Sequence, residues 1–129
     1  MKQKIVGTYP LGWSRVQIVA REGIGGEFWL SPGDIDCPRI KIGLDEDRWE
    51  DVLETLLHEV EELSATIIGT RFWKSAWQSE DSSAYTFVMT HQQFAEIICW
   101  TASLLPACED DLVEMWSKRK GNPDDTFAE

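Results

Sequence analysis

The stretch from Trp49 to Ile67 constrains the fold more strongly than any other part of the chain. Apolar residues recur in it at spacings of three and four, the period of one face of an α-helix. They are Trp49, Val52, Leu53, Leu56, Val60, Leu63 and Ile67. The acids of "DEDRWED" favour the positive end of a helix, Asp47 with Glu50 forms a cap signal, and Gly69 is the expected stop. The sequence therefore predicts one long amphipathic helix that packs on a core.

Alternating polar and apolar residues predict β-strands before this helix. The strands are "WSRVQIVA" (13–20), "FWLS" (28–31) and "RIKIGL" (39–44). Glycines in "REGIGGE" predict a hairpin turn between the first two strands. The turn is favoured over a phosphate-binding loop, because no Lys-Ser/Thr follows and no helix begins there.

The remainder of the chain is expected to contain a second pair of strands and further helix. "RFWKSAW" (71–77) and "SAYTFVMT" (83–90) have strand composition, and Thr90 with Gln93 fits a capping box at a helix start. Pro106 is expected to interrupt that helix, and a third helix would then end at Gly121. The prediction is an α+β fold, in which a small antiparallel sheet packs against the 49–67 helix and one or two C-terminal helices. Residues 1–120 would form a single domain, and 121–129 a flexible acidic tail.

Composition restricts the classes of partner and the compartment. The chain has 129 residues with 23 acidic and 12 basic side chains, a formal charge of -11 that repels phosphates and favours cations or basic partners. We therefore expect no nucleic-acid binding. No signal peptide and no apolar run of roughly 20 residues is found, which predicts a cytoplasmic protein without membrane contact. The three cysteines have unrelated spacings and are expected to be reduced and mostly buried.

The segment "LLHEVEELSA" (56–65) holds the residues most suggestive of chemistry. His58 and Glu62 are four apart, so in a helix they project from the same side and two such ligands can hold one metal ion. Both are expected on the face opposite the apolar stripe, with Ala65, while Glu59 sits on its flank. This placement fits a helix that lines a cleft, and it equally fits residues that face solvent.

"HEVEE" resembles the H-E-x-x-H helix of zinc metallopeptidases of the zincin class, with Glu62 in place of the second histidine. The order of elements is also similar to the smallest, minigluzincin-type members, and to small metallopeptidase-like proteins of phages and bacteria. The resemblance implies His58 and Glu62 as metal ligands and Glu59 as general base. A third ligand would come from the second helix, either His91 or Glu96.

Two functions follow from these features. The resemblance implies a metal-dependent, peptidase-like hydrolase acting on peptide or protein, active or degenerate, with zinc as the metal and manganese or iron(II) as alternatives. The alternative is that this segment is an ordinary acidic helix face. The 49–67 helix carries five glutamates, so a histidine in it would have an acidic neighbour by chance. The protein would then be a non-enzymatic acidic interaction or inhibitor protein, of the kind phages encode, that binds a basic partner.

Overall fold

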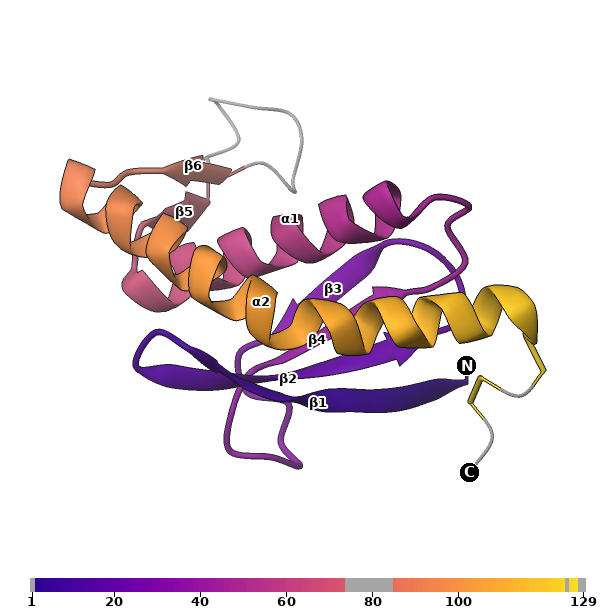
Figure 1. Cartoon of the computed structure of the whole chain (residues 1–129). Coiled ribbons are helices and arrows are strands. Elements are labelled where there is room, and N and C mark those ends of the chain that lie inside the picture. The colour runs from indigo at the N-terminus through magenta and orange to yellow at the C-terminus, as the bar shows by residue number, and fades with distance from the viewer. Residues whose placement is uncertain (1, 74–84, 125, 128–129) are drawn as a thin grey trace.

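The computed structural model describes residues 2–73, 85–124 and 126–127 (Figure 1). A four-stranded sheet and a two-stranded sheet accompany two helices, which confirms the α+β class. The elements in chain order are β1 Gln3–Leu11, β2 Ser14–Arg21, β3 Gly26–Trp29, β4 Arg39–Gly43, α1 Trp49–Ile68, β5 Arg71–Trp73, β6 Tyr85–Phe87 and α2 His91–Gly121. Both helices lie on one side of the larger sheet (Figure 1). The predicted loop 78–83, and the outer parts of its flanking strands at 74–77 and 83–84, lie outside the described residues.

The larger sheet is mixed, and not antiparallel throughout as the sequence predicted. Its strand order is β1-β2-β4-β3, and β2 runs parallel to β4. The predicted hairpin between 13–20 and 28–31 is therefore wrong, because β4 lies between these two strands. Strand β4 lies inside the sheet, where its side chains Ile40 and Ile42 are fully buried. At the edge of the sheet these side chains would be more exposed to water.

Strands β3 and β4 pair antiparallel. Another antiparallel hairpin joins β1 to β2, and β1 was not predicted. Gly12 in its turn has φ 59, a left-handed conformation that favours glycine. The pairing register shifts between Ile5 and Gly7, which interrupts the alternation by which a strand is recognised in sequence.

Helix α1 has the predicted extent but not the predicted N-terminal cap. Its N-cap is Arg48, which makes no side-chain capping bond, so the cap signal from Asp47 and Glu50 is wrong. Its end is as predicted, since Gly69 has φ 87 and donates its backbone N–H to the Ala65 carbonyl.

Helix α2 is one continuous helix of 31 residues, so the predicted interruption at Pro106 is wrong. The capping box of Thr90 and Gln93 is present, as predicted. A proline inside a helix removes one backbone bond and promotes a kink, and α2 changes direction near its middle in Figure 1. The helix continues because both halves pack on the core, through Trp100 and Leu104 before the proline and through Leu112 after it.

The core lies between the sheet and the two helices. Fully buried side chains come from five elements, β1, β2, β4, α1 and α2, and they include Leu11, Ile18, Ile40, Ile42, Leu56, Leu63, Leu104 and Leu112. Cys37 and Cys108 are buried, Cys99 is exposed and all three are free, as predicted. Neither described helix is long and apolar enough to cross a membrane.

The chain after α2 folds back on the domain where it is described. Thr126 is buried and Phe127 packs at the edge of the core, with the Arg119 guanidinium 5.1 Å from its ring centre. The flexibility of 121–129 stays a prediction.

Candidate metal site

Helix α1 lies between α2 and the edge strand β3. Towards α2, Leu56 and Val60 face Leu104 across a dry contact. Towards β3, the backbone of Gly26 approaches α1 so closely that a Cβ there would lie 2.8 Å from Thr55 Cγ2 and 2.9 Å from Glu59 Cγ. Glycine is therefore required at this crossing, and Glu59 is pressed against the strand.

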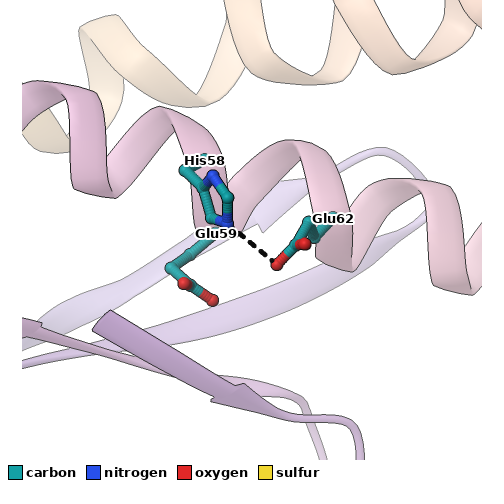
Figure 2. Close-up of side chains that lie close together, drawn as sticks. All are labelled: His58, Glu59 and Glu62. Carbon is teal, nitrogen blue, oxygen red and sulfur yellow. Dashed lines mark ion pairs between the residues drawn. The ribbon is translucent and has the colours of Figure 1, made fainter. Parts of the chain in front are cut away.

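His58, Glu59 and Glu62 project together from the β3 side of α1 (Figure 2). One ligand atom from each residue can be chosen so that all three atoms lie within 4.8 Å of one another. His58 Nε2 lies 3.2 Å from Glu62 Oε2. This group could hold a metal ion.

The three side chains differ in their exposure to water. The His58 side chain is 62% exposed and that of Glu62 only 14%, while Glu59 as a residue is 7% exposed. The group therefore has an open, imidazole side and a covered, carboxylate side. Water and solutes would reach an ion bound here from the side of His58.

Burial raises the pKa of the Glu59 carboxyl, and the negative charge of Glu62 raises it further. The charges of His58 and Arg71 act in the opposite direction, and that of Glu27 adds to the rise. Ionisation of Glu59 is therefore less favourable than that of an exposed glutamate. A cation placed among the three side chains would offset this penalty, because it would favour the ionised form.

A hollow of about 250 Å³ adjoins the group. It is lined by Gly25 and Gly26 from the β3 side and by Glu54, Thr55, His58 and Glu59 from α1. The absence of side chains at the two glycines leaves this space open, so water or a small group can approach His58 and Glu59 directly.

The structure brings together three of the five predicted site residues. His58 and Glu62 are adjacent on one side of α1, as their spacing predicted. Glu59 was expected on the flank of the stripe and is buried under β3. Within the part of the chain that the structure describes, neither His91 nor Glu96 belongs to the group.

His91 and Glu96 come from the first turns of α2, where His91 is exposed and Glu96 half-buried. Helix α2 packs on α1 through the side that carries Leu56 and Val60, and the three site residues point away from it in Figure 2. Their role as a third ligand stays a prediction.

Two residues near the site carried no sequence signal. Gly26 shapes the hollow, and Arg71 at the start of β5 contributes positive charge close to Glu59. The Arg71 guanidinium lies 4.1 Å from the centre of the Tyr85 ring and donates to Thr66 Oγ1 at 3.3 Å. The contact with Tyr85 joins β5 to β6, whereas the bond to Thr66 is local to the turn after α1.

Comparison with protein-family models, with curated proteins and with solved structures finds no match to this chain.

Proposed function

We propose that the protein binds a divalent metal ion at the group of His58, Glu59 and Glu62, with His58 and Glu62 as ligands and Glu59 beside the ion, and that it acts as a metal-dependent hydrolase on peptide or protein. The observation that carries the proposal is the closeness of three ligand atoms, all within 4.8 Å of one another, beside an open hollow. Two ligands that bind one zinc ion at about 2.0–2.2 Å are at most about 4.4 Å apart. Small side-chain rotations would therefore complete the contact.

The donor set determines which ions fit. One imidazole nitrogen and one carboxylate suit zinc, and the oxygen ligand also suits manganese or iron(II). Zinc is the ion we propose first. Because both ligands come from one helix, remaining coordination positions would be filled by water or by a further residue such as His91 or Glu96.

Glu59 is the residue we propose to move a proton. A bound divalent ion would lower the pKa of a coordinated water and polarise a carbonyl group. Glu59 belongs to the same group but is not needed to hold the ion, so its carboxylate could accept a proton from that water. His58 and Glu62 would then be the principal ligands.

The first experiment is metal binding by the purified, untagged protein. After dialysis against a chelator, zinc, manganese or iron(II) would be titrated by calorimetry, and metal content measured by mass spectrometry. We expect one ion per chain for the native protein and none for His58→Ala or Glu62→Gln. Glu54→Gln is the matched control, because Glu54 lines the same hollow but does not belong to the three-residue group.

The results separate a defined site from a diffuse acidic surface. If Glu54→Gln weakens binding as much as Glu62→Gln does, the ion is held by general negative charge and the proposed site is wrong. If no variant and no native sample binds metal, the acidic-protein hypothesis takes its place. For a protein that does bind, an added ion at 100 times its Kd stabilises the fold by about 2.7 kcal/mol, which a thermal unfolding shift would report.

Hydrolysis requires its own test. The loaded native protein and Glu59→Gln would be incubated with unfolded casein and with short peptides, and new termini measured by mass spectrometry. Cleavage by the native protein that is lost in Glu59→Gln, while metal binding is kept, would support the proposed role of Glu59. Metal binding without cleavage in either protein would restrict the function to metal binding.

A further inference from the structure

A second hollow lies where the end of α1 meets β6 and the start of α2. Its walls are mostly apolar, and the residues that matter here are Ala65 and Glu61 of α1, Phe87 and Met89 from the β6 segment, and Phe94 and Ile98 of α2. Its volume is about 140 Å³. We call it the apolar groove. It is separate from the hollow beside His58 and shares no lining residue with it.

Exposed apolar side chains are concentrated around this groove. Of the ten large apolar side chains that are exposed in the described residues, three line the groove: Phe87 at 44%, Phe94 at 51% and Ile98 at 45%. Clustered exposure of this kind marks binding surfaces in soluble proteins, whereas scattered exposure does not. Burial of these side chains by a partner would be favourable.

The size of the groove fits one aromatic side chain of a partner. A cavity of about 150 Å³ lined by apolar residues accommodates a benzene ring. Ala65 forms the floor and is only 1% exposed, so its small side chain leaves the space that a partner's ring would enter. Met89 can adjust to rings of different shape, because its side chain is unbranched and polarisable.

The negative charge beside the groove favours a basic residue next to the inserted side chain of the partner. Glu61 is exposed and is the charged residue of the lining. Helix α1 contains no lysine or arginine, so the acids on its exposed side, including Glu54 and Glu61, present negative charge without local compensation from the helix itself. A cation next to the inserted ring would therefore be attracted.

We propose that the apolar groove binds one aromatic side chain of a peptide partner, with a basic residue beside it that contacts Glu61. This goes beyond the metal site and does not need an ion. Ala65 follows Glu62 by about one helical turn and Glu61 directly precedes it, so the groove adjoins the candidate metal site along α1. A peptide held in the groove could therefore extend along α1 towards His58.

The test uses three defined probes: N-acetyl-Phe-Lys-amide, N-acetyl-Phe-Glu-amide and N-acetyl-Ala-Lys-amide. Each would be titrated in the presence of a chelator into protein with labelled isoleucine and methionine methyl groups, and followed by NMR. We expect the Phe-Lys probe to shift the signals of Met89 and Ile98. The Phe-Glu probe should bind about twofold to fivefold more weakly, which is the usual range for one exposed charge pair, and the Ala-Lys probe should give no shift at the same concentration.

Variants identify the groove as the site. Ile98→Asp should abolish the response at Met89, whereas Ile5→Asp is the matched control, since Ile5 is 58% exposed on β1 and lies outside the groove. Glu61→Gln should make the Phe-Lys and Phe-Glu probes bind equally. His58→Ala should bind the probes like the native protein, which separates this proposal from the metal site.

The proposal is overturned if the three probes give equal shifts, if none shifts Met89 or Ile98, or if Ile5→Asp loses binding as Ile98→Asp does. A loss of folding in Ile98→Asp would be visible in its spectrum. Ala65→Leu, which fills the floor of the groove without adding charge, then supplies the same comparison: it should block the Phe-Lys probe, and unchanged binding would overturn the proposal.

Discussion

Replacing Gly26 by alanine is expected to destabilise the protein and to disturb the candidate metal site at the same time. The added Cβ would lie 2.8 Å from Thr55 Cγ2, 2.9 Å from Glu59 Cγ and 3.2 Å from the Lys41 carbonyl oxygen. Carbon atoms in contact prefer separations of about 3.5–4.0 Å, so α1 and β3 would have to move apart by a substantial fraction of an ångström.

The magnitude follows from how little the neighbours can yield. Thr55 is β-branched, and its Oγ1 donates to the Asp51 carbonyl at 3.1 Å, so turning Cγ2 away would break that bond. Overpacking of this kind costs about 1–3 kcal/mol. The loss of unfolded-chain freedom on replacing glycine by alanine offsets about 0.4–1 kcal/mol. We expect a net loss of about 1–2 kcal/mol.

The assay is urea unfolding followed by tryptophan fluorescence, together with zinc titration. Gly121→Ala is the control, because no atom lies within 4 Å of a Cβ placed there, and it should not lower stability. Thr55→Ser in the Gly26→Ala background removes the methyl group nearest the new Cβ and should recover part of the loss. A Gly26→Ala protein with native stability and native zinc affinity would refute the close packing of α1 on β3 as the determinant of the site.

Three further outcomes are expected. The Arg119 guanidinium lowers the pKa of the Asp45 carboxyl, so the stability that this carboxyl contributes is present above its ordinary pKa near 3.8 and is lost as pH falls through the lowered value. Native and Asp45→Asn proteins should therefore differ in urea midpoint at pH 6 and converge near pH 2. A constant difference would contradict this. A thiol reagent should label the folded protein once, at the exposed Cys99, with the other two cysteines reacting only after unfolding; two or more labels on the native protein, counted by mass spectrometry, would argue against their burial. The Ser64 hydroxyl is fully buried and has no hydrogen-bond partner among the described residues, so Ser64→Ala should raise the unfolding free energy by about 1 kcal/mol, and a loss of stability in urea would speak against an unpaired hydroxyl.

The parts of the fold that sequence predicted well are those set by a few consecutive residues. The apolar stripe places α1, Gly69 ends it, and the Thr90–Gln93 box begins α2. The prediction of a helix end at Pro106 was wrong because it, too, used only a local preference. Its local preference is to end a helix, but packing of both halves of α2 on the core outweighs that preference.

In the candidate site, too, only the part set by local geometry could be predicted from the sequence. The pairing of His58 with Glu62 follows from helical spacing, and the structure places their atoms 3.2 Å apart. The third ligand could not be chosen from sequence, because the distance from α1 to His91 or Glu96 depends on how two helices pack. The zincin resemblance stays a prediction that metal binding and cleavage assays would test.

By itself, the sequence determined a long acidic helix with His58 and Glu62 on one side, because helical geometry repeats every 3.6 residues whatever surrounds it. Only the tertiary structure decided that β4 lies between β2 and β3, that Gly26 presses on Glu59 and buries it, and that Ala65 forms the floor of a groove. These features arise from competition among distant segments for burial against one core, and no local pattern records which segment takes which place.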